Sequence, residues 1–329
     1  MAKFRLPQAP ACNKMLTFRA DTPWLAPLAG YSDLPFRLLC REFGASVTTT
    51  EMISAKGLCY ESPGTLPLLQ TTERDQPLVV QLFGAEPEFL GQATAALVQA
   101  GYCYFDLNMG CSVPKVMRQK AGAALLGTPD LALACARAMI KEAGPGRVGC
   151  KLRLGLSASN NCLPDLALRL EEAGAAWITL HPRYAGQHFQ GEADHAWLTR
   201  LAQTLHIPLI ASGDLLTAQA GLSCLEKTKV SCVMYARGAL KNPAIFEDHL
   251  HLQKGLPSKE RSLRDLLLRH LKLVEDYPPS PRDQTARMRG ILSSYVRGTP
   301  CARAMRIDFC QARTWSELYT IVDRYLLDS

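Results

Sequence analysis

The sequence lacks two features that would define its class directly, a membrane-spanning run and a metal-binding cysteine spacing. No stretch approaches the roughly 18 consecutive apolar residues of a transmembrane helix, and the N-terminal segment has no apolar signal core. The 12 cysteines are scattered and form no C-x-x-C pair, so zinc and iron–sulfur sites are not expected. We therefore expect a soluble, cytoplasmic, metal-free protein with reduced cysteines.

The length and charge distribution suggest two parts. A chain of 329 residues suits a barrel of about 250 residues with an additional domain. Its 47% hydrophobic and 20% charged residues are ordinary for a globular protein and exclude general disorder. The net charge is +7, and residues 255–329 contain 13 Lys and Arg against 9 Asp and Glu. That end is therefore a candidate surface for a polyanion.

Short apolar runs alternate with amphipathic segments along most of the chain. The amphipathic segments have helical spacing, and Gly101, Gly144 and Gly174 stand at their ends. This alternation predicts an α/β fold with a parallel sheet, and eight runs favour a (β/α)8 TIM barrel over residues 23–250, after a leader of residues 1–22. The predicted strands are Trp24 to Leu28, Val47 to Met52, Leu78 to Phe83, Tyr104 to Met109, Val148 to Leu154, Trp177 to His181, Ile207 to Ser212 and Cys232 to Ala236.

Chemically useful residues follow nearly every predicted strand. In a barrel these strand ends gather at one mouth, so the residues would converge on one pocket. Cys111 is a candidate because it follows the strand ending at Met109 and the turn-forming Gly110. A free cysteine considered alone is more often buried core, and that alternative remains open. The strand-end residues are Pro27, Leu28, Ala29, Gly30, Glu51, Gln81, Asn108, Cys111, Lys151, Arg153, His181, Arg183, Ser212, Gly213, Asp214, Arg237 and Gly238.

The loops after the seventh and eighth strands predict a phosphate site. They contain Ser212, Gly213 and Asp214, and then Ala236 and Arg237. Barrels often bind phosphate there through backbone N–H groups, and an arginine adds a charge-assisted bond. Alone, such Gly-Asp and Arg-Gly sequences are common in turns, so their placement after these two strands carries the prediction.

A phosphate in these loops would place the rest of a mononucleotide cofactor across the mouth. Flavin mononucleotide (FMN) fits, because Gln81 supplies an amide for its pyrimidine edge and Lys151 supplies a positive charge near N1 and O2. The backbone from Pro27 to Ala29 would lie beneath the ring. Cys111 would lie beyond the flavin face, where a thiol that is mostly protonated at neutral pH can act as a general acid.

The C-terminal residues 255–329 predict a helical bundle. Its expected helices are Arg261 to Tyr277, Arg282 to Val296, Cys301 to Ala312 and Trp315 to Leu327, the last preceded by a capping-box sequence. Arginines align on the second and third of these helices, where they are either solvated or in contact with nucleic-acid phosphates. These arginines are Arg282 and Arg289 on the second, and Arg303, Arg306 and Arg313 on the third.

The strand-end residues belong to an ordered set of short motifs. The motifs are Ala26-Pro27-Leu28-Ala29-Gly30, Asp33-Leu34-Pro35-Phe36-Arg37, Thr50-Glu51-Met52, Gln81-Leu82-Phe83-Gly84, Asp106-Leu107-Asn108-Met109-Gly110-Cys111, Lys151-Leu152-Arg153, His181-Pro182-Arg183, Ser212-Gly213-Asp214 and Ala236-Arg237-Gly238. This set resembles the tRNA-dihydrouridine synthase family. The likeness runs from about Trp24 to Phe246, and more weakly through the helical tail. It is specific because other flavin barrels do not share the motifs in this order.

The resemblance implies an FMN enzyme that uses NADPH to reduce the C5–C6 double bond of a particular uridine in tRNA. Hydride would pass from flavin N5 to uracil C6, and Cys111, which matches the family's catalytic cysteine, would protonate C5. Asn108, Arg153 and Arg183 match positions expected to bind substrate, as Lys151 and His181 match flavin positions. The helical bundle would bind tRNA, with Arg282, Arg289, Arg303 and Arg306 as candidate contacts, and we expect a monomer.

Four positions depart from the family pattern. Ser112 stands where the family usually has proline, so the loop after Cys111 could be held differently. Leu28, Ser212 and Ala236 replace the common methionine, asparagine and glycine. All three keep the backbone groups that would contact flavin, so we still expect the cofactor to bind.

Two other functions remain open from the sequence. A flavin barrel acting on a small molecule, as in dihydroorotate-type oxidoreductases, would not require the basic bundle. A non-catalytic RNA-binding barrel would not require Cys111, Lys151 and His181.

Overall fold

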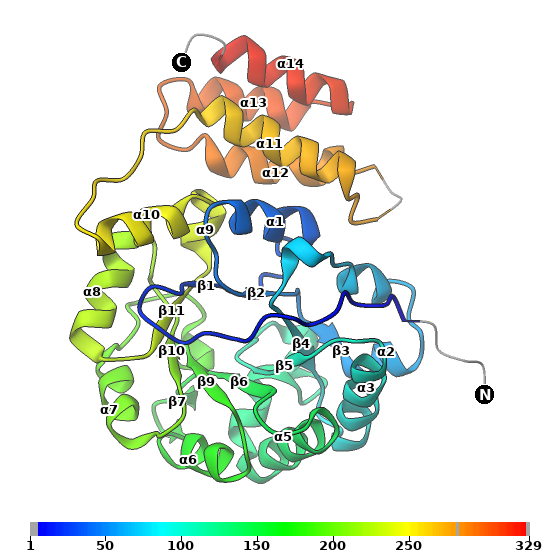
Figure 1. Cartoon of the computed structure of the whole chain (residues 1–329), viewed down its shortest axis with the longest axis vertical. Helices are drawn as coiled ribbons and strands as arrows, with labels where there is room; N and C mark the ends of the chain where they lie inside the picture. Colours follow the sequence, from blue (N-terminus) through cyan, green and yellow to red (C-terminus); the bar gives the residue numbers. More distant parts are fainter. Residues whose placement is uncertain (1–5, 281–282, 327–329) are drawn as a thin grey trace.

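The computed structural model describes residues 6–280 and 283–326, which form a parallel barrel with four further helices beside it (Figure 1). The barrel strands lie in the order β1-β11-β10-β9-β6-β5-β4-β2, and each neighbouring pair is parallel. A parallel bridge between Trp24 and Val47 closes the ring. The predicted (β/α)8 barrel with a C-terminal helical bundle is therefore confirmed.

Strands and helices alternate as the sequence predicts, although several strands are shorter than the apolar runs. The barrel strands are β1 (Trp24–Leu25), β2 (Thr48–Thr49), β4 (Leu78–Phe83), β5 (Tyr104–Met109), β6 (Val148–Leu152), β9 (Trp177–Leu180), β10 (Leu209–Ala211) and β11 (Cys232–Tyr235). The helices around them are α1 (Leu34–Glu42), α2 (Ala55–Cys59), α3 (Pro87–Gln99), α4 (Pro114–Met117), α5 (Pro129–Ala143), α6 (Asp165–Glu172), α7 (Ala196–Thr204), α8 (Ala218–Thr228), α9 (Arg237–Lys241) and α10 (Ile245–Gln253).

Three short strands were not predicted. Strand β3 (Ile53–Ser54) pairs with β4, and β7 (Gly155–Ser157) forms an antiparallel hairpin with β8 (Asn160–Asn161). The hairpin follows β6, so it enlarges the loop region at the carboxyl end of the barrel. Runs of two or three residues are too short to show a periodic pattern in the sequence.

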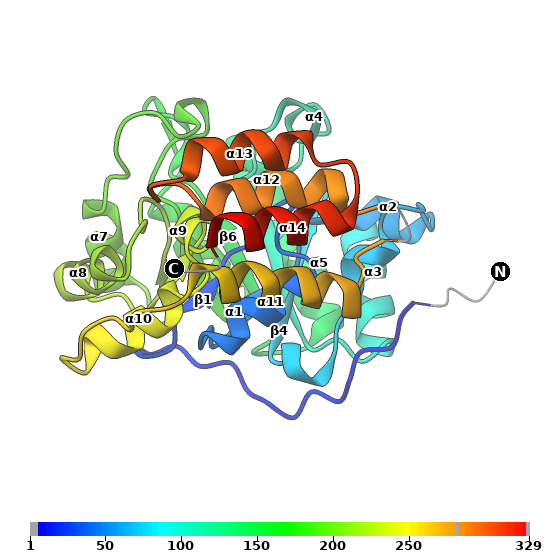
Figure 2. The same cartoon turned by 90° about the horizontal axis from the view of Figure 1, so that it is seen from above.

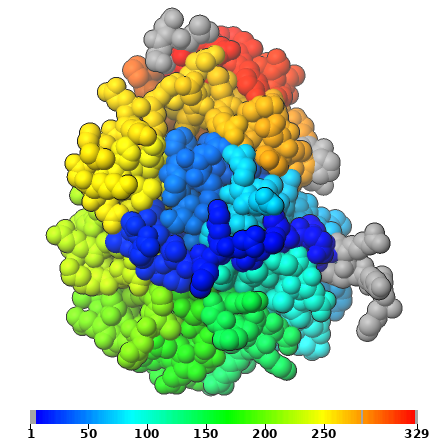
Figure 3. All heavy atoms as spheres, viewed as in Figure 1, coloured from blue at the N-terminus to red at the C-terminus, as the bar shows by residue number. Residues whose placement is uncertain are grey.

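Aromatic residues fill the amino-terminal half of the barrel interior. Trp24 and Trp177 meet edge to face, with ring centroids 5.8 Å apart. Phe18 of the N-terminal segment packs on both rings, and this segment crosses the face of the barrel in Figure 3. A Cβ at Gly149 would lie 2.0 Å from the Trp177 ring, so glycine makes room for the indole. This end of the barrel is therefore a closed apolar core.

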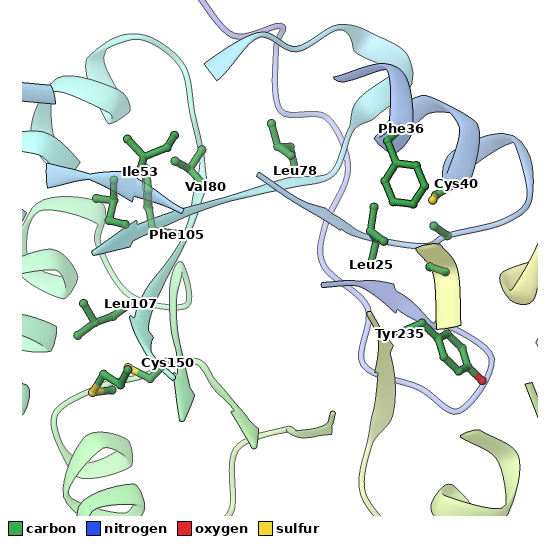
Figure 4. Packing of buried hydrophobic residues seen from close by; sticks show 14 of the residues in the cluster. Leu25, Phe36, Cys40, Ile53, Leu78, Val80, Phe105, Leu107, Cys150 and Tyr235 are labelled. Carbon is green, nitrogen blue, oxygen red and sulfur yellow. The ribbon is translucent and has the colours of Figure 1, made fainter. Parts of the chain in front are cut away.

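The carboxyl half of the interior is polar because side chains alternate along the strands. On β5, Phe105, Leu107 and Met109 are buried in the outer core between strands and helices, where Figure 4 shows the first two. Asp106 and Asn108, on the opposite face, hydrogen-bond to Gln81 of β4 inside the barrel. The same alternation that builds the core thus places amide and carboxylate groups at the mouth.

The four C-terminal helices are α11 (Leu263–Asp276), α12 (Thr285–Tyr295), α13 (Ala302–Gln311) and α14 (Trp315–Leu326). Helix α11 packs on α1 through an apolar cluster that includes Leu38 and Leu273. In Figure 2, α13 lies along the same edge of the molecule as α4, which follows β5, and the N-terminal segment lies along the opposite edge. Helix α13 is therefore on the mouth side of the bundle.

The helix ends differ slightly from the predicted ones. Helix α13 ends at Gln311, so Arg313 lies after the helix and does not share a face with Arg303 and Arg306. Helix α12 begins at Thr285, and the predicted tRNA contact Arg282 falls outside the described residues. At α14 the Glu317 N–H donates to Thr314 Oγ1, while the Glu317 carboxylate accepts from the backbone of Arg313, one residue before the expected cap.

Candidate active site

The mouth of the barrel contains a cavity of about 380 Å³. It brings together residues from all eight barrel strands or from the loops that follow them. Of the strand-end residues expected at this pocket, four lie outside its lining: Gly30, Glu51, Arg183 and Gly238. Apolar rim residues, among them Val113 and Leu216, accompany a small number of polar groups, as is typical of ligand sites. The predicted residues that line the cavity are Pro27, Leu28, Ala29, Gln81, Asn108, Cys111, Lys151, Arg153, His181, Ser212, Gly213, Asp214, Ala236 and Arg237.

The loop that carries Cys111 is fixed on both sides. The backbone N–H groups of Gly110 and Cys111 donate to Asn108 Oδ1 at 3.2 and 3.0 Å. The carbonyl oxygen of Cys111 accepts from the Ala123 N–H at 2.9 Å. Gly122, with φ of +64°, permits this approach, because a Cβ there would lie 2.6 Å from the Cys111 oxygen. The thiol is therefore held half-buried at the cavity by a rigid backbone.

Three polar side chains form a hydrogen-bonded chain beneath this loop. Asn108 Nδ2 donates to Gln81 Oε1 at 2.8 Å, and Gln81 Nε2 donates to Asp106 Oδ2 at 2.7 Å. The Asn108 amide is thereby used by the protein on both sides, with Met52 Sδ as its remaining neighbour at 3.8 Å. Both ends of the Asn108 amide thus have partners within the protein, and the predicted substrate-binding role of Asn108 stays a prediction.

Lys151 provides a positive charge inside the cavity. Asp106 and Lys151 lie on neighbouring strands, and burial has opposite effects on them, raising the pKa of Asp106 and lowering the pKa of Lys151. Their mutual attraction opposes both shifts. Lys151 Nζ makes no hydrogen bond to any residue that the structure describes, so its N–H groups remain available for a ligand.

His181 is held in its neutral form. Burial, helped by the nearby charges of Lys151, Arg153 and Arg183, lowers the pKa of His181 to about 2. Its Nε2 lies 3.2 Å from Nη1 of Arg183, and an arginine N–H can only donate. Nε2 must therefore be the acceptor, which leaves the proton of the neutral imidazole on Nδ1.

Arg153 and Arg183 differ in how many donors they keep. Arg183 uses all five N–H groups within the protein, for Gln190 O, Gly191 O, His181 Nε2 and both oxygens of Asp214. Arg153 donates from Nε and Nη1 to backbone carbonyls, and its Nη2 has no partner among the described residues. Arg153 therefore keeps donors that a ligand could use, whereas the donors of Arg183 are used within the protein, and the substrate-binding roles of both stay predictions.

Asp214 organises the predicted phosphate loops. Its carboxylate accepts from Arg183, Arg237 and the Ala193 N–H, and these contacts hold the pKa of Asp214 below its ordinary value against the effect of burial. A Cβ at Gly213, whose φ is +102°, would lie 2.5 Å from the His181 ring, so only glycine allows this backbone path. A ligand at this loop would contact the Gly213 backbone and the Arg237 side chain.

Several cavity residues were not predicted from the sequence, among them His188 and Phe189. Phe189 is 59% exposed and packs between charges, with Arg237 Cζ 4.6 Å and Arg153 Cζ 5.7 Å from its ring centroid. His188 lies 3.3 Å from the hydroxyl of Ser112, the residue that replaces the usual proline. Both lie in the loop after β9, beyond the strand end, where neither a motif nor a periodic pattern marks them.

The candidate tRNA contacts are less uniform than predicted. Arg303 and Arg306 of α13 are exposed, whereas Arg289 of α12 is half-buried. Arg287, which was not predicted, forms an ion pair of 2.7 Å with Asp33 and so links α12 to the loop before α1.

Within the described ranges, every helix is too short or too polar to cross a bilayer. No group of three or more His, Cys, Asp or Glu in those ranges could hold a metal ion.

The fold and the cavity define an α/β-barrel protein with a mouth cavity that contains cationic side chains, an amide and a cysteine. The sequence description of the dihydrouridine synthase (Dus) family matches residues 24–324. The chain therefore belongs to the dihydrouridine synthase family, and the family prediction is confirmed.

Curated relatives have the same family name. The chain is 32% identical to a probable tRNA-dihydrouridine synthase 1 of Synechocystis sp., over 91% of this chain and 84% of that protein. It is 33% identical to a tRNA-dihydrouridine synthase B of Xanthomonas campestris pv. campestris, over 78% of this chain and 79% of that protein. Among solved structures it resembles an old yellow enzyme homologue from Zymomonas mobilis, with a TM-score of 0.53 and 12% identity over 82% of this chain and 99% of that one, which supports the barrel fold alone.

Proposed function

We propose that the protein is a tRNA-dihydrouridine synthase that binds FMN at the barrel mouth and takes its reducing equivalents from NADPH. One observation carries the proposal. In a chain that matches the Dus family over residues 24–324, the Cys111 loop is fixed at a cavity that also contains Gln81, Lys151 and Arg153. The amide and the two cations suit a flavin and a uracil. The thiol at the same cavity can serve as the proton donor.

The residues of the mouth fit FMN. Lys151 and Arg237 give the cavity positive charge for a phosphate and for an anionic reduced ring. Gly213 lines the cavity without a side chain, so phosphate oxygens could approach its backbone. Asp214 is the one carboxylate at this point, and Arg183 and Arg237 neutralise it. When bound, FMN supplies the hydride for C6 of the uracil.

The chain's own residues would supply the proton and the orientation. Cys111 holds a proton at Sγ and donates it to uracil C5, after which the thiolate is reprotonated from solvent. Arg153 can present its two free Nη2 hydrogens to a uracil oxygen. His181 stays neutral and adds no further charge next to the two cations. The contacts of each residue within the protein thus leave it able to perform its proposed role.

A uridine in folded tRNA must leave the base stack to reach this cavity, at a cost of a few kcal/mol. Contacts between phosphates and the basic helices would offset that cost and select the nucleotide that enters. The exposed Arg303 and Arg306, on the mouth side of the bundle, are suited to this role.

The test is an assay of dihydrouridine formation with unmodified tRNA, NADPH and FMN-loaded protein. Replacement of Cys111 with Ala should slow turnover about 10²- to 10⁴-fold while NADPH still reduces the flavin, because only the proton donor is lost. Cys103→Ala is the matched control, since Cys103 lies directly before β5, at the end of the strand opposite to Cys111. Protein that takes up no FMN, or that reduces small pyrimidines but not tRNA, would contradict the proposal.

A further inference from the structure

We propose that Asp106 is a positioning residue, which acts through Gln81 and Asn108 to set both the hydrogen-bond donor at the cofactor cavity and the position of the Cys111 loop. The inference rests on the proposed function for the identity of the ligand. The hydrogen-bond chain itself is a property of the protein alone. It connects the carboxylate of a buried strand residue to the backbone of the residue that carries the thiol.

The direction of every hydrogen bond in this chain is determined by its two ends. At one end the N–H groups of Gly110 and Cys111 can only donate, so the Asn108 oxygen must face them. Asn108 Nδ2 must then donate to Gln81 Oε1, which turns Gln81 Nε2 toward Asp106. At the other end, the carboxylate oxygen of Asp106 accepts. All the amides in the chain therefore have one consistent orientation.

Reversal of one amide would break the chain at two points. A flipped Gln81 would place its oxygen against the Asp106 oxygen and its NH2 group against the NH2 group of Asn108. Both conflicts would lie in the interior, since Gln81 has no exposed surface, Asp106 is 4% exposed and Asn108 7%. Unpaired polar groups are costly in such surroundings, so the chain behaves as a unit.

The consequence at the cavity is a defined donor. Gln81 lines the cavity, its oxygen is used by Asn108, and one Nε2 hydrogen is used by Asp106. The second Nε2 hydrogen has no acceptor among the described residues, and Gln81 lies in the cavity wall although it is buried. A ligand that contacts Gln81 there would therefore meet an N–H and no acceptor. An acceptor at the ligand's pyrimidine edge is therefore favoured, and the same chain holds the Cys111 loop in place.

The chain requires an acceptor at position 106, whereas a purely electrostatic role with Lys151 would require a charge. Asp106→Leu removes the acceptor and keeps the branching at Cγ, with a larger side chain. Asp106→Asn removes the charge but can still turn its oxygen toward Gln81. Thr179→Val is the matched control, because Thr179 is paired in register with Lys151 in the same interior and its buried hydroxyl has no hydrogen-bond partner in the described chain.

The first measurement uses flavin-free protein and does not depend on enzyme activity. The rate of iodoacetamide alkylation at Cys111 is followed by peptide mass spectrometry and normalised to the exposed Cys301 and Cys310. Asp106→Leu should change the normalised rate severalfold, while Asp106→Asn and Thr179→Val should match the parent protein. Normalisation to cysteines of the helical bundle separates a local effect on the loop from general unfolding.

The second measurement is FMN affinity and the visible spectrum of the bound flavin. Asp106→Leu should weaken FMN binding by up to about tenfold, the value of one uncharged hydrogen bond, and should shift the spectrum, with Asp106→Asn again restoring the parent values. If Asp106→Leu does not fold, Gln81→Met interrupts the same chain at its centre and should produce the same alkylation change. Where both single variants fold, the double variant Asp106→Leu, Gln81→Met should change neither measurement beyond the single variants.

The outcomes separate this inference from the proposed function. Unchanged Cys111 alkylation in both Asp106→Leu and Gln81→Met would overturn it, as would an Asp106→Asn protein that behaves like Asp106→Leu. A parent protein that binds no FMN or makes no dihydrouridine would instead contradict the proposed function, and the alkylation result would still decide whether the chain positions the loop.

Discussion

Two buried arginines of the barrel and two exposed arginines of helix α13 are used in opposite ways. In the barrel, Arg37 and Arg183 are each 1% exposed and donate to a carboxylate and to backbone carbonyls. On α13, Arg303 and Arg306 are exposed and have no hydrogen bond or ion pair with any residue that the structure describes. The first pair holds protein segments in place, and the second pair keeps its charge available for a partner.

The difference follows from what each region must do. A guanidinium group with all its donors satisfied fixes the segments that it joins, which a cavity with a precise chemical task requires. A polyanion such as tRNA is bound largely by release of its counterions, which needs positive charge but little fixed geometry. The first and the third of the predictions below test this contrast, and all three are given from the largest expected effect to the smallest.

The buried pair of Arg37 and Asp75 should be essential for stability. Asp75→Ala leaves the Arg37 charge unpaired in the interior, which should cost about 3–5 kcal/mol in the free energy of unfolding. Urea denaturation gives the comparison. Asp130→Ala is the control, since Asp130 is 93% exposed in its ion pair with Arg169 and its loss should cost at most about 1 kcal/mol. Equal losses in the two variants would remove the distinction between buried and exposed arginines.

His270, at the contact between α11 and α1, should make the protein less stable in acid. Its Nδ1 lies 2.9 Å from the Tyr295 hydroxyl, its ring packs on Phe36, and burial lowers the pKa of His270 to about 3. Between that pH and the ordinary value of 6.5, the unfolded chain binds a proton that the folded protein does not. The free energy of unfolding therefore falls as the pH falls through this range.

Replacement of His270 with Asn should remove this contribution. On lowering the pH from 7 to 5, the parent protein should lose about 2 kcal/mol more than His270→Asn in the free energy of unfolding. Other titrating groups, such as His181, contribute equally to both proteins and cancel in the comparison. Parallel pH profiles for the two proteins would show that His270 is not held neutral in the folded state.

The arginines of α13 should affect tRNA binding and leave stability unchanged. Each lost phosphate contact lowers the slope of log Kd against log salt by about one unit, so the double variant Arg303→Gln, Arg306→Gln should lower it by up to about two. Arg137→Gln, an exposed change on the barrel helix α5, is the control for net charge. An unchanged slope in the double variant would mean that these arginines belong to a solvated face.

The sequence predicted the barrel because its signal is local. Strands β4 and β5 begin and end where their apolar runs do. A strand that is buried on both faces has apolar residues at most of its positions, so its ends are visible in the sequence. Strands β2 and β10 have only two and three residues, because the pairing stops before the apolar run ends. At one cavity lie 14 of the 15 predicted catalytic, cofactor and substrate residues, as expected for the carboxyl ends of barrel strands. Arg183 and the strand-end residues Gly30, Glu51 and Gly238 lie outside its lining.

By itself, then, the sequence determined the order of the elements, the residues delivered to the mouth and the family, because periodicity and motifs are properties of neighbouring residues. Only the tertiary structure decided which groups remain free to react. Two of the donors of Arg183, a predicted ligand contact, are used by Asp214, 31 positions away, and its other donors by its own loop and His181. Asp106 meets Gln81, 25 positions before it. Hydrogen-bonding capacity is used up by partners that are distant along the chain, and no local pattern records those partners.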